Sequence, residues 1–382
     1  MELQLAERDY SCRLDTQAFA RMLGDPTQCY KFYWLDALIV LAAEKGGGPI
    51  AFGEAIDEMI AAAWGSVVRC HLRLGPRTAS ERNLLEAAVL KLAGAAGLAP
   101  SASRAEVRQA AREHRAAIRA ERTALAKYVP YRLLAPFLAL SGNDPLWDSK
   151  ARLIAFIARK NAQKALPYTI EDGRGLEKSV TFGPDWARLI ADNFAVIRGW
   201  IQFKKAEYLQ ARNPGVPGIL AKIDPDSGAV RRLDNARALW RTASEAEERP
   251  LIDIYSGAPI EGAFALDHFV PWSYVACDEL WNLTPAEASV NSSKSDRLPD
   301  WGRFFGALAA EQYFLYGAVQ RSEAVRRAFE KCRRDNLNDE SAAAALTAEG
   351  LSEKAFRSAL ADHLHPVWET ARLQGYPVWT PD

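Results

Sequence analysis

The chain has 382 residues, of which 49% are hydrophobic and 25% charged, and its formal net charge is zero. This length suits two or three domains, or one large domain with an insert, and the composition is that of an ordinary globular protein. Because the net charge is zero, the chain as a whole does not attract nucleic acid, and any such affinity must come from local basic patches.

Cysteine usage and the N-terminal stretch bear on the compartment. The five cysteines are scattered and odd in number, which argues against a disulfide framework and fits a reducing cytoplasm. The stretch MELQLAERDY is charged and has no apolar core, so it does not resemble a signal peptide. No apolar run approaches the roughly 18 residues that cross a bilayer. We therefore expect a cytoplasmic protein without membrane contact.

Two helices are predicted early in the chain. Asp25 can cap the first, with Gln28 three residues later completing a capping box. Its apolar residues recur at helical spacing: Tyr30, Tyr33, Trp34, Ala37, Leu38 and Leu41. The run at 46–48 is all glycine and ends this helix, and a second helix is expected over 52–69. An aromatic stripe at this spacing predicts a core face rather than a platform for stacked bases.

The stretch 103–126 carries a row of arginines on a predicted helix. They are Arg104, Arg108, Arg112, Arg115, Arg119 and Arg122. On one continuous helix they fall within about an 80° arc. A row of guanidinium groups is suited to tracking phosphates, so these six are candidates for nucleic-acid binding. The alternative is a solvated or acid-paired face.

The remaining pattern outside residues 251–300 is helical. From 128 to 212 it is broken near 141–144 and near 171–173, with helices expected over 151–162 and 185–209. The Pro/Gly run at 214–218 predicts a boundary, and Asp224 to Gly228 a turn. Later helices are predicted over 235–245, 301–314, 323–334 and 351–373.

Residues 253–299 contain the polar residues from which a site can be built. A strand ending in Asp267 and His268 is followed by a second short strand at 281–283 and then by a polar helix. Thr284 is expected to cap that helix, with Pro285 at its first position and Glu287 completing a capping box.

These side chains suggest hydrolytic chemistry. The carboxylate of Asp267 and the amide oxygen of Asn291 suit a single magnesium or manganese ion, with water and a phosphate oxygen as further ligands. His268 can act as a general base because its ordinary pKa lies near neutrality, and Asn282 can hold the imidazole from the facing strand. Neighbours on a strand point to opposite faces, so Asp267 and His268 can share a site only at a frayed or twisted strand end.

The segment resembles the HNH (ββα-metal, His-Me finger) endonucleases, and most of all the HNH domain of the CRISPR type II effectors. It has the D-H-x-x-P-x-S opening and the N-x-x-K-S-D ending of that domain. The matching residues are Asp267, His268, Pro271, Ser273, Asn282, Asn291, Lys294, Ser295 and Asp296. The resemblance implies that Asp267 and Asn291 are metal ligands, that His268 is the base and that Asn282 orients it.

Two departures from the family pattern are visible. The final His of the family name is Asn here, which is a common variant. Many members also carry two C-x-x-C pairs that bind structural zinc, and these cysteines are missing from residues 253–299. We therefore expect one divalent ion, magnesium or manganese, and no structural zinc.

The predicted fold is mainly α, with a small ββα-metal (HNH) nuclease module near the C-terminal third. The predicted domains are a helical scaffold or recognition domain at 1–218, a helical connection at 219–250, the HNH module at 251–300 and a C-terminal helical region at 301–382.

The predicted function is metal-dependent hydrolysis of DNA by an HNH endonuclease, with a role in restriction or phage defence by analogy only. Lys294, one turn after Asn291, is a candidate contact to a backbone phosphate, with a plain surface lysine as the alternative. Two other classes stay open. One is a nucleic-acid-binding or regulatory protein with a catalytically silent HNH fold, and the other is a helical interaction module that uses the insert only structurally. A homodimer or a protein partner is also open.

Overall fold

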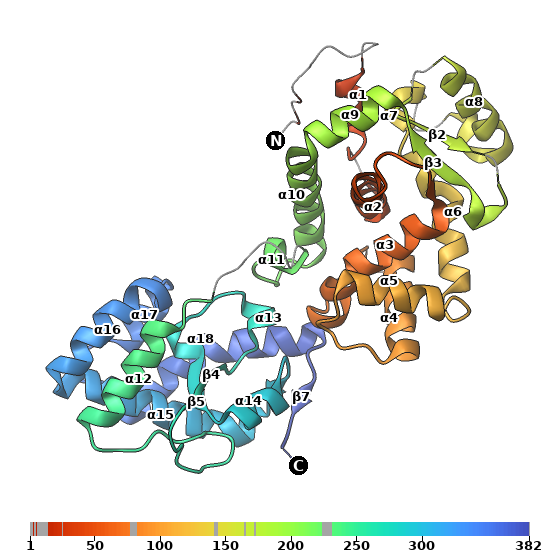
Figure 1. Ribbon diagram of the computed structural model, residues 1–382. Helices are drawn as coiled ribbons and strands as arrows, with labels where there is room; N and C mark the ends of the chain where they lie inside the picture. The colour runs from red at the N-terminus through yellow and green to blue at the C-terminus, as the bar shows by residue number, and fades with distance from the viewer. Residues whose placement is uncertain are drawn as a thin grey trace. The chain divides into compact units, whose positions relative to one another are not determined.

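The computed structural model describes residues 3, 5, 14–24, 26–76, 82–140, 144–163, 166–171, 173–223 and 231–381. It divides into two compact units (Figure 1). Unit 1 comprises Met1–Pro214 with Lys222–Pro225, and unit 2 comprises Gly215–Ala221 with Asp226–Asp382. Both are built mainly from helices, and the strands are few and short. The predicted mainly α fold class is therefore confirmed.

Unit 1 is helical with one small sheet. Its helices are α1 (Thr16–Arg21), α2 (Tyr30–Glu44), α3 (Phe52–Trp64) with a π-helical turn (Gly65–Arg69), α4 (Leu84–Ala96), α5 (Arg104–Glu113), α6 (Arg119–Arg132), α7 (Ala135–Leu138), α8 (Lys150–Ala162), α9 (Pro184–Asp192) and α10 (Phe194–Arg212), with 3-10 turns η2 (Pro145–Asp148) and η3 (Gly175–Glu177). Its sheet is antiparallel in the order β1 (Ile50–Ala51), β3 (Ser179–Phe182), β2 (Tyr168–Glu171). Helix α11 (Ile219–Ile223) contains residues of both units.

The apolar periodicity located the first buried helices correctly. Helix α2 begins at Tyr30, and Tyr33 and Trp34 on it are fully buried, so the aromatic stripe belongs to the core as predicted. The helix expected over 52–69 is also present, as α3 and the π-helical turn. The predicted cap, Asp25, lies outside the described residues.

The prediction of one continuous arginine helix is wrong. The chain leaves the helix after Glu113 and resumes it at Arg119, so five of the arginines lie on two separate helices and Arg115 lies in the turn between them. Of the six, Arg112, Arg115 and Arg119 are exposed. Because of this break, the six side chains do not share the single face that one continuous helix would have given them.

The other three arginines pair with carboxylates. Arg104 Nη1 lies 3.1 Å from Glu58 Oε1, and Arg122 Nη2 lies 2.8 Å from Asp57 Oδ1. Asp57 and Glu58 are buried residues of α3, and a buried carboxylate needs such a partner. Arg108 pairs with Glu44 and Glu58. Half of the predicted phosphate-binding row therefore holds α5 and α6 against α2 and α3.

The expectation that the chain between 128 and 212 is helical apart from breaks near 141–144 and 171–173 is also wrong. Strands β2 and β3 form an antiparallel hairpin in which Tyr168 pairs with Phe182. Both strands contain β-branched and aromatic residues, which favour extended structure, and this signal did not enter the prediction. The helix expected over 185–209 is divided at Asn193 into α9 and α10. Helix α8 is present as predicted.

Unit 2 surrounds the HNH-like segment with helices. Its helices are α12 (Asp234–Ala246), α13 (Trp272–Val275), α14 (Ala288–Lys294), α15 (Trp301–Arg321), α16 (Glu323–Asn336), α17 (Glu340–Leu346) and α18 (Glu353–Gln374), with a 3-10 turn η5 (Leu280–Asn282). Strands β4 (Ala265–His268) and β5 (Leu283–Ala286) are antiparallel, and β6 (Leu298–Pro299) and β7 (Val378–Trp379) are parallel. The four helices predicted over 235–245, 301–314, 323–334 and 351–373 are present as α12, α15, α16 and α18. Helix α17 was not predicted.

Strands β4 and β5 share one core with the helices around them. Leu266 and Leu283 belong to a buried cluster that includes Trp240 of α12 and Phe329 of α16. Gln312 of α15 donates hydrogen bonds to the backbone oxygens of Leu280 and Leu283, at 3.0 and 2.7 Å. The finer division at residues 218, 250 and 300 stays a prediction. None of the helices in the described part of the chain has the length and apolar character needed to cross a membrane.

The ion pair between Arg122 and Asp57 gives a first testable prediction. Replacing Arg122 with Gln leaves a buried carboxylate without its cation, so we expect the free energy of unfolding of unit 1 to fall by about 3 kcal/mol. Arg119→Gln on the same helix removes an exposed arginine and should change it by less than about 0.5 kcal/mol. Urea denaturation measures both, and equal effects would contradict a structural role for Arg122.

Candidate active site

The site is built on β4, β5 and α14, in that order along the chain. In the antiparallel pair, Asp267 lies opposite Thr284, and His268 lies opposite Leu283. The predicted strand end at His268 is therefore confirmed. The predicted capping box at Thr284 is wrong, because pairing with β4 keeps Thr284 and Pro285 extended and α14 begins only at Ala288.

A buried aspartate that the sequence reasoning missed organises the start of α14. Asp253 is fully buried, and its Oδ2 accepts a hydrogen bond of 2.8 Å from the backbone N–H of Glu287. Its Oδ1 accepts from the N–H groups of Tyr255 and Ser256, at 2.8 and 3.2 Å. Asp253 thus ties the turn at 253–256 to the N-terminus of α14, where an anionic side chain is favourable.

Asp267 lies in a buried charged network. Its Oδ1 is 3.0 Å from the ammonium of Lys294, which also donates a 2.8 Å bond to the carbonyl of His268. Its Oδ2 accepts a hydrogen bond of 2.5 Å from the hydroxyl of Tyr255. Burial raises the pKa of Tyr255, and the negative charges of Asp267 and Asp253 raise it further, so this hydroxyl stays protonated at neutral pH. Lys294 is fully buried, so it is not a plain surface lysine.

His268 is held by a second aspartate that the sequence reasoning missed. Its Nε2 lies 2.9 Å from Oδ1 of Asp278, and the other carboxylate oxygen accepts a 2.9 Å bond from the backbone N–H of Arg232. Burial alone would raise the pKa of Asp278, but the hydrogen bonds from His268 and Arg232 outweigh it and hold that pKa below its usual value. An ionised carboxylate only accepts hydrogen bonds, so Nε2 carries the proton and a neutral ring has Nδ1 unprotonated.

Asn282 has a different position from the one expected. Its side-chain oxygen accepts from the N–H of Val270 at 2.8 Å, and its Nδ2 donates to the carbonyl of Val270 at 2.9 Å. These bonds fix the turn that follows β4. In this structure Asp278, and not Asn282, contacts the imidazole.

The donor chemistry of this region fits a hard cation. Asp267 and the carbonyl of His268 already hold a buried positive group, the ammonium of Lys294. Asn291 is a half-buried residue of α14, one turn before Lys294. Among the described residues, no three His, Cys, Asp or Glu side chains are grouped so that they could hold a metal ion. Asp267 and Asn291 offer a carboxylate oxygen and an amide oxygen, which are donor types that a hard cation prefers.

A comparison with family models identifies this segment. Residues 253–300 match the model described as HNH endonuclease. The match begins at Asp253 and includes Asp267, His268, Asp278 and Asn291. No curated protein and no solved structure matches the chain. The predicted resemblance to HNH endonucleases is thus confirmed for this segment, and it indicates a nuclease.

The buried Asp267–Lys294 pair generates a prediction about stability. Lys294→Met leaves the carboxylate buried without its cation, so the free energy of unfolding of unit 2 should fall by about 3 kcal/mol. Adding Asp267→Asn removes the unpaired charge and should restore part of this loss. Lys331→Met, at an exposed position of α16, is the control. Additive effects of the two changes in a double-mutant cycle would contradict the pairing.

Proposed function

We propose that this protein is a metal-dependent HNH endonuclease that hydrolyses phosphodiester bonds in DNA. The observation that carries the proposal is the His268–Asp278 pair, which lies within the segment that matches the HNH family and in which His268 directly follows the buried Asp267 in β4. A base, a residue that fixes its tautomer and a hard anionic ligand are the protein groups that this reaction needs.

The proton transfer follows from the geometry of the pair. Because Asp278 accepts from Nε2, the free nitrogen Nδ1 of His268 would take the proton of a water molecule that attacks phosphorus. The ring then becomes an imidazolium, which the carboxylate of Asp278 stabilises. Asp278 acts through His268 and is therefore a positioning residue, while Asn282 supports the same turn through Val270.

Asp267 and Asn291 would hold the divalent ion, magnesium or manganese. When bound, such an ion stabilises the charge that grows on the phosphate oxygens and on the leaving 3′ oxygen. Lys294 holds the carboxylate of Asp267 in place, and its positive charge suits a nearby phosphate.

The module itself is poorly suited to holding a polyanion. Residues 251–300 contain eight acidic and two basic side chains. Contacts to the DNA backbone must therefore come largely from basic surfaces elsewhere in the chain. Of the predicted arginine row, only the exposed Arg112, Arg115 and Arg119 stay candidates, since Arg104, Arg108 and Arg122 pair with carboxylates. The proposed setting is the cytoplasm, with restriction or phage defence as the role by analogy.

A second candidate is a nucleic-acid-binding or regulatory protein whose HNH fold is catalytically silent. The observation that favours it is that both carboxylate oxygens of Asp267 are engaged, by Lys294 and by Tyr255, while His268 is buried. The two candidates differ in cleavage activity alone, so one assay separates them.

That assay is incubation of the purified protein with plasmid DNA and Mg²⁺ or Mn²⁺. We expect nicked or linear products that EDTA prevents. His268→Ala should lower the rate at least roughly a hundredfold because the general base is lost. Asp267→Asn and Asn291→Ala should lower both the rate and the affinity for Mn²⁺, which isothermal titration measures. Cleavage by His268→Ala at the unchanged rate would refute the assignment of the base.

The positioning role of Asp278 has its own test. Asp278→Asn keeps the side-chain size but no longer fixes the proton on Nε2, so kcat should fall roughly a hundredfold while KM stays within about twofold. Asp278→Glu, which restores the charge, should recover part of kcat. Glu261→Gln, at an exposed position of the same segment, is the matched control. A rise in KM with kcat unchanged would show that Asp278 does not act on the base.

A further inference from the structure

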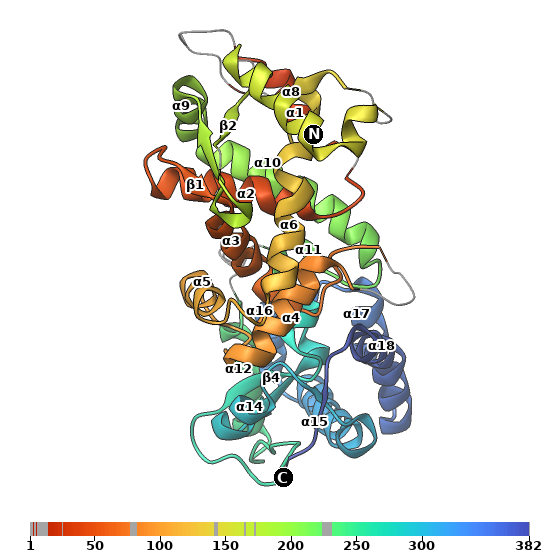
Figure 2. The ribbon, with the colours of Figure 1, turned by 90° about the vertical axis from the view of Figure 1, so that its right-hand side faces the viewer.

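Basic side chains gather in unit 1 at one surface of α6, α8 and the turn before β3. We call it the lysine surface and define it as Lys127, Tyr128, Arg132, Lys150 and Lys178. Lys127 Nζ and the Arg132 guanidinium carbon lie 5.0 and 5.5 Å from the ring centre of Tyr128. That ring is 44% exposed. Figure 2 shows α6 and α8 within unit 1.

The two remaining lysines converge on Tyr131. Lys150 Nζ and Lys178 Nζ lie 5.7 and 5.9 Å from the centre of its ring, and Lys178 also donates a 3.3 Å bond to its hydroxyl. Partial burial lowers the pKa of Lys150, and the charges of Lys178 and Lys127 lower it further. The three ammonium groups are therefore close enough to repel one another.

No ion pair between the described residues compensates the charges of this cluster. Among the ion pairs between described residues, none includes Lys127, Arg132, Lys150 or Lys178. The arginines of the same unit behave differently, since Arg104 and Arg122 each meet a buried carboxylate. In a chain with equal numbers of acidic and basic residues, unpaired cations side by side are a binding surface for an anion.

The lysine surface continues into a groove of about 700 Å³. Tyr128 and Arg132 belong to both, and the groove adds two basic residues, Arg21 and Lys31, and the aromatic residues Tyr30 and Trp147. None of the described residues that line it is acidic. Phosphate-binding cations beside exposed rings are the combination that single-stranded nucleic acids use, because every base can stack on a ring.

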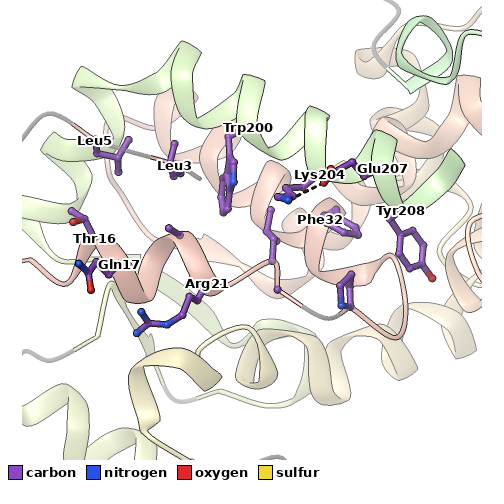
Figure 3. Close-up of a pocket in the computed structure, with 14 residues that line it drawn as sticks. Leu3, Leu5, Thr16, Gln17, Arg21, Phe32, Trp200, Lys204, Glu207 and Tyr208 are labelled. Carbon is purple, nitrogen blue, oxygen red and sulfur yellow. Dashed lines mark hydrogen bonds and ion pairs between the residues drawn. The ribbon is translucent and has the colours of Figure 1, made fainter. Parts of the chain in front are cut away.

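A larger pocket in the same unit lacks this character (Figure 3). Its volume is about 930 Å³, and its centre is lined by the apolar side chains of Trp200 and Phe32. Its lysine, Lys204, is paired with Glu207 at 2.8 Å. Charge thus distinguishes the groove beside Tyr128 from this pocket.

We propose that the lysine surface and its groove bind a nucleic-acid strand with unpaired bases, with phosphates along Lys127, Arg132 and Lys150 and a base beside Tyr128. This deepens the proposed nuclease function and rests on it for the choice of nucleic acid as the ligand. It places further phosphate contacts at the C-terminal half of α6 and the start of α8, in addition to the candidates Arg112, Arg115 and Arg119.

The test compares two sets of basic residues in unit 1 with equal charge changes. Binding of a fluorescent single-stranded oligonucleotide is measured by anisotropy, in EDTA and in full-length His268→Ala protein, so that cleavage plays no part. One variant carries Lys127→Glu, Arg132→Glu and Lys150→Glu, and the other carries Arg82→Glu, Arg174→Glu and Arg188→Glu, three basic positions of unit 1 outside the lysine surface and the arginine row. All six positions are exposed, and circular dichroism checks that both variants fold.

We expect the first variant to weaken binding at least roughly tenfold and to lower the salt slope of log K by about 2, since three phosphate contacts are lost. The second should stay within about twofold of its parent. Equal weakening by both, or unchanged binding of the first, would overturn the proposal. The milder Lys127→Gln, Arg132→Gln and Lys150→Gln variant should show a smaller loss in the same direction.

A further experiment tests whether an unpaired base contacts Tyr128. Tyr128→Leu should weaken binding of the single strand roughly tenfold, since one stacked base is lost, and should affect a duplex of the same sequence less. Equal wild-type affinity for both, unchanged by Tyr128→Leu, would overturn the base contact. Binding to phosphatidylserine vesicles without binding to the oligonucleotide would assign the surface to a membrane instead.

The outcomes also separate this proposal from the nuclease function. If the wild-type protein fails to cleave DNA while the His268→Ala protein binds the oligonucleotide through the lysine surface, the nuclease proposal fails and the surface stands. If the wild-type protein cleaves and the first variant binds as well as its parent, the surface fails alone.

Discussion

The arrangement of the candidate site depends on hydrogen bonds that reach Asp278 from outside the HNH-like segment. Its Oδ2 accepts from the backbone of Arg232, 46 residues earlier, and its carbonyl accepts from Asn336, 58 residues later. The next residue, Glu279, is buried and accepts from the backbone of Asn338. The loop that orients His268 is thereby fixed by the chain on both sides of the module. The surrounding helices therefore form part of the site, since an imidazole is a useful base only when its tautomer and orientation are set.

Features that depend on neighbours in the sequence could be predicted from it. The periodicity around Tyr33 and Trp34 located a buried helix, and the order of residues around Asp267 and His268 located the end of β4. Predictions that ignored tertiary partners failed. Thr284 has the sequence of a helix cap, but strand pairing with Asp267 outweighs a local capping preference. Asp278 has no motif of its own, because its role arises only when the loop folds back on His268.

The arginine row shows that charged partners from other parts of the fold also could not be predicted from the sequence. A helical repeat of guanidinium groups predicts an open phosphate-binding face only if no carboxylate folds against it. Asp57 and Glu58 are adjacent on α3 and buried, so they need Arg122 and Arg104 as partners, because an unpaired buried carboxylate is costly. Because these partners lie far apart in the sequence, their pairing could not be predicted from it. Conversely, Lys127 and Lys150 have no regular spacing, and only the fold brings their charges together.

Burial also explains why Asp267 and Lys294 must be considered together. A carboxylate removed from water costs several kcal/mol unless a positive group accompanies it, and here that group is the ammonium at 3.0 Å. The pairing compensates the charge of Asp267 within the core. The hydroxyl of Tyr255 is held protonated by burial and by the charge of Asp267, so it donates to the carboxylate and cannot compete with it for a cation. Lys294 and Tyr255 therefore give both oxygens of this buried carboxylate a partner.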